Sequence, residues 1–98
     1  MVQIEKVEKS NRKNKKLKAI LSDGKEVHFG LEGSFTYTDG ATKEKRDSYL
    51  KRHMGNKIEK HLIENLIISP SLLSAYILWN TNDIDKNVKI LNDLLKKK

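Results

Sequence analysis

Basic side chains gather in two segments of the chain, and their types and spacing point to phosphate binding. Residues 9–16 contain five cations and no acid, and residues 43–53 contain five Lys and Arg beside two acids, a Tyr and a His. Clustered ammonium and guanidinium groups attract polyanions and can lie along a phosphate backbone without reading its bases. The candidate nucleic-acid contacts are therefore Lys9, Arg12, Lys13, Lys15, Lys16, Lys43, Lys45, Arg46, Tyr49, Lys51, Arg52 and His53.

The second segment carries an aromatic ring among its cations. On a helix, Arg46, Tyr49 and His53 share one side. Lys45, Tyr49 and Arg52 form an adjoining stripe. Such a ring can help its neighbours bind a phosphate, or it can stack on a base. The other interpretation is structural: the Tyr covers the edge of the core, while the long basic side chains bury their stems and keep their charges in water.

Both basic segments also have a simpler explanation. The first has the composition of a flexible, solvated hairpin loop or of a localisation signal. In the second, Glu44 and Asp47 can form ion pairs with Lys51 or Arg52, which would reduce the field that a ligand meets. The net charge of +7 is also compatible with a role in solubility alone.

No spacing in the chain is typical of a catalytic or metal site. His28, His53 and His61 lack the i, i+4 spacing of a helical zinc pair, and the chain contains no Cys. The carboxylates are scattered among lysines, where ion pairing explains them. We therefore expect a non-enzymatic protein with no catalytic residues, no metal ligands and no cofactor. A phosphate-handling enzyme built on Arg46, Arg52 and His53 would need these side chains to converge with a carboxylate in a pocket.

Length and composition predict one small domain, residues 1–98. Of its 98 residues, 34% are charged and 37% hydrophobic. The longest apolar-rich stretch, Leu72–Trp79, is far shorter than the ~20 residues needed to cross a bilayer. The N-terminus reaches charged residues before an apolar signal segment can form. We expect a soluble protein that is not secreted and has no membrane partner.

Period-two patterns in the N-terminal part predict an antiparallel meander of about three strands. The predicted strands cover residues 2–7, 17–21 and 27–29. A basic loop at residues 9–16 joins the first two. Asp23-Gly24 joins the next two and is a strong hairpin signal, because a type I′ turn needs positive φ at both central positions. Residues 31–41 have the composition of an irregular loop.

From residue 42 onwards the apolar period becomes helical, and we expect three to four short helices. Thr42 is a candidate N-cap and Ser69-Pro70 a second helix start. The run 72–79 is apolar all round, so it should be buried, with Trp79 as an anchor whose indole N–H reaches a local carbonyl. The helical segments are 43–53, one marked by Ile58, Leu62 and Leu66, the run 72–79, and 84–95. The fold class is therefore α+β.

Several short motifs follow one another in a characteristic order: Asp23-Gly24-Lys25, Val27-His28-Phe29-Gly30, Tyr37-Thr38, Arg46 with Tyr49-Leu50, Arg52-His53 and Leu73–Asn80. In this order they resemble a family of small, uncharacterised basic proteins of nucleocytoplasmic large DNA viruses, both mimivirus-like and phycodnavirus-like. The resemblance runs from about Lys16 to the final helix. Two departures are extra residues at 56–68 and a C-terminus without the basic-aromatic tail of that family.

The resemblance implies a viral setting and offers no established reaction. Together with the charge, it leads to the hypothesis of a non-enzymatic protein that binds nucleic acid, with DNA as the first choice and low sequence specificity, in genome packaging or the virion core. The alternative is a structural or interaction module of the virion that binds an acidic protein or forms a homo-oligomer. Either protein would lie in the virion or in the cytoplasm or nucleus of the infected host cell.

Overall fold

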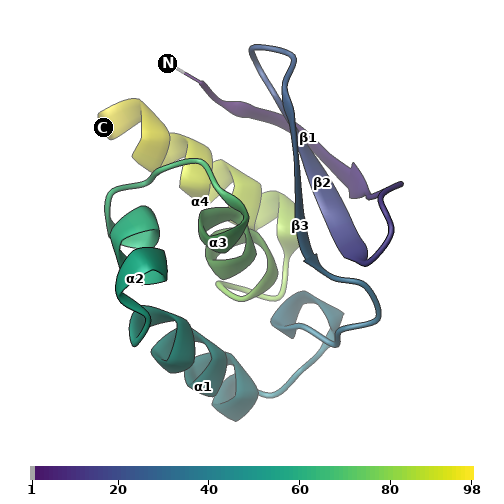
Figure 1. Cartoon of the computed structure of the whole chain (residues 1–98), viewed down its shortest axis with the longest axis vertical. Helices are drawn as coiled ribbons and strands as arrows, with labels where there is room; N and C mark the ends of the chain where they lie inside the picture. The colour runs from purple at the N-terminus through teal and green to yellow at the C-terminus, as the bar shows by residue number, and fades with distance from the viewer. Residues whose placement is uncertain (1) are drawn as a thin grey trace.

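The N-terminal part of the chain folds into a three-stranded antiparallel sheet in which strand order follows sequence order. The computed structural model describes residues 2–98. The strands are β1 (Ile4–Lys9), β2 (Lys15–Leu21) and β3 (Glu26–Leu31). Figure 1 shows the sheet on one side of the molecule and the helices on the other. The predicted α+β fold, a meander followed by helices, is confirmed.

A bulge in β1 explains the uneven spacing of its apolar residues. Ile4 pairs with Leu21 and Val7 pairs with Ala19, so a step of three residues in β1 matches a step of two in β2. The extra residue turns Val7 to the same side of the sheet as Ile4. Ile4, Ala19 and Leu21 are buried on this face together with Phe29 of β3. It is the face that packs against the helices.

The basic loop is shorter than the predicted 9–16. The strands leave only residues 10–14 as the connection, because Lys9 pairs with Leu17 and Lys15 pairs with Leu31. Main-chain hydrogen bonds extend the hairpin whatever the side chain, although Lys has a low intrinsic preference for strands. Lys9, Lys15 and Lys16 therefore belong to strands and not to a flexible connection.

Two short helices follow the sheet. The connection from β3 contains a 3₁₀ turn, η1 (Tyr37–Asp39), and leads to α1 (Lys43–Met54) and α2 (Lys57–Glu64). As predicted, Thr42 caps α1: its hydroxyl accepts a hydrogen bond from the Lys45 amide at 3.2 Å. No helix within residues 2–98 has both the length and the apolar character needed to span a bilayer.

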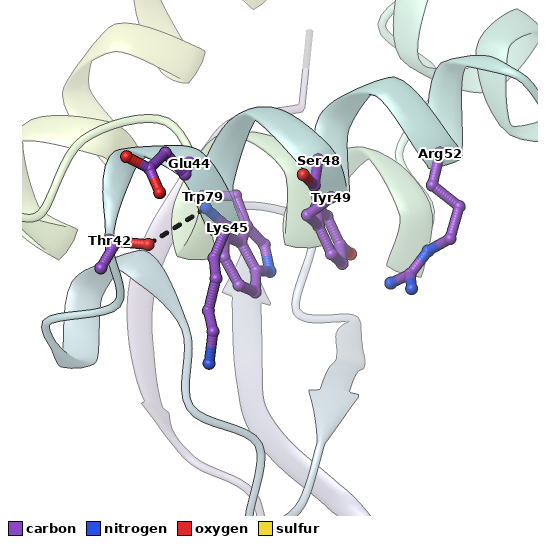
Figure 2. A pocket seen from close by; sticks show the side chains of 7 residues that line it. All are labelled: Thr42, Glu44, Lys45, Ser48, Tyr49, Arg52 and Trp79. Atoms are coloured by element: carbon purple, nitrogen blue, oxygen red, sulfur yellow. Dashed lines mark hydrogen bonds between the residues drawn. The ribbon is translucent and has the colours of Figure 1, made fainter.

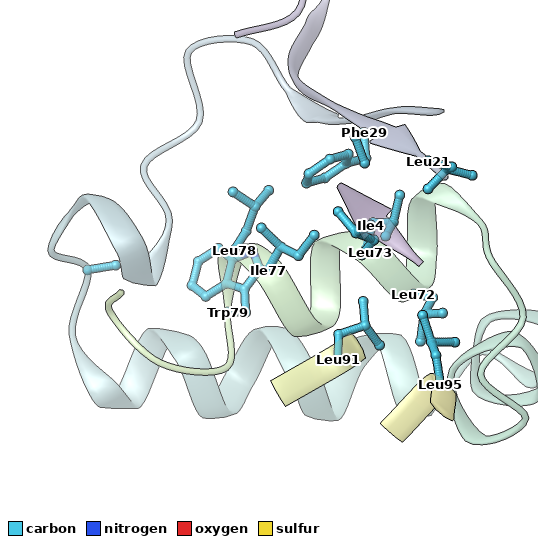
Figure 3. Close-up of a cluster of buried hydrophobic side chains, with 12 residues drawn as sticks. Ile4, Leu21, Phe29, Leu72, Leu73, Ile77, Leu78, Trp79, Leu91 and Leu95 are labelled. Carbon is cyan, nitrogen blue, oxygen red and sulfur yellow. The ribbon is translucent and has the colours of Figure 1, made fainter. Parts of the chain in front are cut away.

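The buried centre of the fold is the segment that follows Ser69, as predicted. Ser69 caps α3 (Pro70–Leu73), which continues into the π-helical turn η2 (Ser74–Leu78). Figure 3 shows Leu73 and Ile77 between Phe29 of the sheet and Leu91 of α4 (Ile84–Lys97). The core therefore joins the sheet, α3, η2 and α4 in one cluster.

The buried side of α2 differs from the predicted one. Ile58 is 74% exposed, and Leu66 lies beyond the helix with a φ of 52°. The buried residue is Ile63, the neighbour of the predicted Leu62. One residue corresponds to about 100° of rotation on a helix, so the buried stripe has turned and Ile58 faces solvent.

Candidate nucleic-acid interface

Three shallow clefts follow one another between α1 and the β1–β2 hairpin. The helix cleft, of about 450 Å³, is lined by Thr42, Glu44, Lys45, Ser48, Tyr49, Arg52 and Trp79. The central cleft, of about 430 Å³, is lined by residues of β2, β3, α1, α2, α3 and η2 and the segments beside them. The hairpin cleft, of about 400 Å³, is lined by Lys9, Lys15, Lys16, Glu32 and Gly33. Neighbouring clefts share lining residues, so we call the three together the cleft row.

The central cleft brings the two basic segments together. Lys15 begins β2 and Arg52 lies near the end of α1, yet both line this cleft. Lys9 continues the row at the hairpin cleft, and Lys45 continues it at the helix cleft. None of these four cations forms an ion pair within residues 2–98. Four predicted cations without an ion pair thus line three adjoining clefts.

Two other predicted contacts already form ion pairs or hydrogen bonds within the protein. Lys16 Nζ lies 2.9 Å from Asp39 Oδ2 and donates a hydrogen bond to the Ser34 carbonyl at 2.9 Å. Arg46 Nε donates to the Asn80 carbonyl, also at 2.9 Å. These bonds tie β2 to the η1 segment and α1 to the end of η2. Both side chains therefore offer less to a ligand than the sequence predicts.

The remaining basic candidates lie outside the clefts. Arg12 and Lys13 are exposed in the connection between β1 and β2. Lys43 and Lys51 are exposed on α1, and neither lines any of the three clefts. These four side chains add exposed positive charge to the same segments but do not line the cleft row.

A column of three rings lies along the helix and central clefts. The Tyr49 ring stacks on Trp79, with centroids 4.3 Å apart and planes 12° apart, and its centroid lies 4.0 Å from that of His53. The Arg52 guanidinium carbon also lies over the Tyr49 ring, 5.7 Å from its centroid, so these three neighbours together leave no free face of Tyr49 on which a base can stack. Burial raises the pKa of the Tyr49 hydroxyl. The structure therefore favours the interpretation of Tyr49 as part of the core edge.

Each cleft also contains one carboxylate. Glu44 lines the helix cleft, Glu59 the central cleft and Glu32 the hairpin cleft. Glu59 is engaged: its Oε1 lies 2.8 Å from His53 Nδ1 and accepts a hydrogen bond from Ser71 Oγ at 3.2 Å. The lining of the row contains five Lys and Arg against these three acids, so its positive excess is modest.

The sequence did not predict Trp79 as a residue of this surface. Its place at the end of an apolar run signals burial, and the residue is buried. However, it also lines the helix and central clefts. The prediction that its indole N–H reaches a local carbonyl is wrong, because no group within residues 2–98 accepts a hydrogen bond from it. Only the tertiary contact of Trp79 with Tyr49 of α1 places it at these clefts.

Comparison with known proteins identifies the family. Residues 5–53, half of the chain, match the family of unknown function DUF5754. The chain belongs to this family. It is also 37% identical over 79 residues to an uncharacterised protein of Acanthamoeba polyphaga mimivirus, an alignment that covers 76% of this chain and 79% of that one. No solved structure matches the chain.

These matches bear directly on the cleft row. Residues 5–53 include most of the sheet and nearly all of α1, so Lys9, Lys15, Lys45 and Arg52 all lie in the matched region, whereas Trp79 lies beyond it. The predicted resemblance to an uncharacterised viral family is confirmed.

Proposed function

We propose that this protein binds nucleic acid through phosphate contacts along the cleft row, without catalysing a reaction. The observation that supports this most is the lining of the central cleft by both Lys15 and Arg52, which come from separate basic segments. Lys9 and Lys45 extend the line of cations in the two adjoining clefts. Contacts of this kind go to the phosphate backbone, so binding would tolerate any base sequence.

The surrounding charge favours such a ligand. The chain has a net charge of +7, and Arg12, Lys13, Lys43 and Lys51 flank the row. At physiological salt, exposed charges are screened over a length of about 8 Å, so a cation outside the row should contribute less to binding than one that lines it. Duplex DNA carries about one negative charge for each 1.7 Å of its axis, and neutralising phosphates releases counterions. The affinity of the protein should therefore fall as salt rises.

The test compares two double variants that lose the same charge. Lys15→Gln with Arg52→Gln removes two cations from the central cleft, and Lys43→Gln with Lys51→Gln removes two from outside the row. Binding of a fluorescently labelled oligonucleotide is measured by anisotropy over a series of salt concentrations. The cleft variant should weaken binding at least about tenfold and reduce the salt slope by about two units. The control variant should weaken binding far less.

Two results would contradict the proposal. Affinity that does not change between low and physiological salt would exclude phosphate contacts as the main interaction. Equal weakening by the two double variants would show that net charge matters and the cleft row does not.

A viral setting supports a role with the genome. The mimivirus relative is consistent with a place in the virion or the infected cell, and we propose genome packaging or the virion core as that place. Mass spectrometry of purified virions should then detect the protein. Nuclease treatment of the disrupted particles should release it from the genome fraction.

A second candidate function rests on two exposed apolar side chains. Leu31, the last residue of β3, is 65% exposed, and Phe35, in the connection that follows, is 60% exposed. Apolar side chains of this size at the surface favour a protein contact, such as self-association or an acidic partner in the virion. Light scattering after size-exclusion chromatography distinguishes the candidates, because a stable homo-oligomer free of nucleic acid would favour this second one.

A further inference from the structure

One hydrogen-bond donor in the cleft row has no partner. The Trp79 residue is only 8% exposed, and its ring stacks on Tyr49. Every buried side-chain N or O atom within residues 2–98 has a hydrogen-bond partner. No hydrogen bond within these residues is donated by the indole nitrogen, so this atom must have some accessible surface, and Trp79 lines both the helix cleft and the central cleft. A donor fixed on a buried ring can bind an acceptor with little loss of conformational freedom.

Two cations line the same cleft as this donor. Figure 2 shows Lys45, Tyr49 and Arg52 leaving the same side of α1, with the indole nitrogen of Trp79 between the Lys45 ammonium and the Arg52 guanidinium in this view. Arg52 and Trp79 line both the helix cleft and the central cleft. The guanidinium stays charged at any physiological pH and presents a planar fork of donors.

We propose that Arg52 and Trp79 form a phosphate subsite at the junction of the helix cleft and the central cleft. This rests on the proposed function and assigns the position in the row where directed hydrogen bonds hold one backbone phosphate. Arg52 supplies the fork that matches phosphate geometry, Trp79 supplies a fixed neutral donor, and Lys45 supplies a flexible charge. The covered faces of Tyr49 exclude a base from stacking there, so the phosphate and not the base is recognised.

Two carboxylates make the subsite weak for a single anion. Glu44 and Glu59 line the helix and central clefts and repel a phosphate. Glu59 is partly compensated, because its Oε1 accepts from Ser71 and lies 2.8 Å from His53 Nδ1. Free phosphate should therefore bind weakly. A polymer binds more tightly, because other cations of the row hold its neighbouring phosphates and raise the effective concentration.

The test uses the full chain and its single Trp, which gives one indole N–H resonance in a proton–nitrogen correlation spectrum. Inorganic phosphate is titrated at constant ionic strength against chloride. The indole resonance should move and saturate. Arg52→Gln should weaken the phosphate affinity at least about fivefold, because it removes the charge-assisted hydrogen bonds. Lys43→Gln, outside the clefts, should weaken the affinity far less.

A second titration, with a short single-stranded oligonucleotide, separates the sources of phosphate and the two proposals. Movement of the same resonance at a far lower concentration than with phosphate supports both. An oligonucleotide that binds without moving the resonance overturns the subsite and leaves the proposed function standing. A response to phosphate but none to the oligonucleotide overturns the proposed function and leaves a free-phosphate site. A resonance that phosphate does not move, or moves equally in Arg52→Gln, overturns the subsite.

Discussion

Lys16 shows how an ion pair within the fold can make a cation less available to a ligand. Its ammonium lies 2.9 Å from Asp39 Oδ2, and the Thr36 amide and hydroxyl both donate to the same oxygen at 2.9 Å. Burial alone would raise the pKa of Asp39, but the hydrogen bonds from Lys16 and Thr36 outweigh burial and lower the pKa below its usual 3.8. The carboxylate thus stabilises the η1 turn against β2.

Asp39→Asn should reduce the free energy of unfolding by about 1 kcal/mol at neutral pH, since the bonds are charge-assisted but partly exposed. The folded-state pKa lies below the unfolded value, so this stabilisation is present above the unfolded pKa and is lost as pH falls through the folded pKa. Urea unfolding over a pH series should show the difference between wild type and variant shrinking below pH 3.8. A difference that persists there would contradict this account.

The matched control is Asp47→Asn. Asp47 also forms an ion pair at 2.9 Å, but its side chain is 57% exposed. Solvent and salt screen such a pair, and its contribution to stability is small. The control variant should unfold at nearly the same urea concentration as the wild type at every pH.

At the residue scale, the sequence shows which side chains are cationic but not which remain available. Thr42 was predicted as a cap because its partner, the Lys45 amide, lies within one helical turn. Lys16 and Arg46 were predicted as phosphate contacts, but Asp39 and the Asn80 carbonyl, which engage them, lie far along the chain. Such partners become visible only when β2, η1, α1 and η2 are packed together.

At the element scale, Gly30 allows β3 and η2 to approach closely. It has a φ of 79°, and a Cβ at this position would lie 2.9 Å from Leu78 Cδ1 and 3.1 Å from Lys16 Cβ. A side chain at this position would therefore require the buried Leu78 side chain or Lys16 to shift. The sequence suggested only that this glycine ends a strand.

Gly30→Ala should lower the free energy of unfolding by about 2–4 kcal/mol, because a positive φ and the contact with Leu78 act together. Gly24→Ala is the control: Gly24 has a φ of 88°, but nothing lies within 4 Å of an added Cβ. That variant should lose only about 1–2 kcal/mol, the cost of the backbone conformation. Urea unfolding of both variants measures the difference, and equal losses would show that the close approach contributes nothing.

Local residue preferences explain the elements that the sequence predicted, and tertiary packing explains those that it did not. The Asp23-Gly24 hairpin and the Ser69-Pro70 helix start follow from local residue preferences, and both are present. The turn is not the predicted type I′, however, because Gly24 has a positive φ and Asp23 does not. The bulge between Ile4 and Lys6 is not encoded by a Gly or Pro in the strand. It follows from the need to turn Val7 towards the core, which only the packed sheet imposes.

At the scale of the whole molecule, the row of cations depends on how α1 is placed relative to the turn end of the β1–β2 hairpin, where Lys9 and Lys15 lie. Charge clustering in the sequence identified both basic segments, but the sequence could not place them on one side of the fold. The central cleft does so for Lys15 and Arg52. Lys43 and Lys51 lie outside the clefts, because residues 45, 48, 49 and 52 form the side of α1 that lines them.

The two ends of the chain are joined by one side chain. Asn92 of α4 accepts a hydrogen bond from the Ile4 amide at 2.8 Å and donates to the Ile4 carbonyl at 2.9 Å. The Asn92 side chain thus pairs with both the N–H and the C=O of Ile4 at the edge of β1, as the main chain of a neighbouring strand would. Ile4 is buried in the same cluster as Leu91 and Leu95, so this contact fixes the sheet on α4.

Asn92→Ala should therefore loosen β1 before the rest of the fold. Losing two hydrogen bonds at a buried edge costs about 1–3 kcal/mol, and the better helix propensity of Ala offsets about 0.5 kcal/mol of this. Hydrogen exchange should accelerate at the Ile4 amide, which loses its acceptor, more than at amides of β2. Asn82→Ala, at an exposed position, should change neither exchange nor stability. If Ile4 exchanges at the wild-type rate in Asn92→Ala, packing of its side chain alone holds β1 on α4.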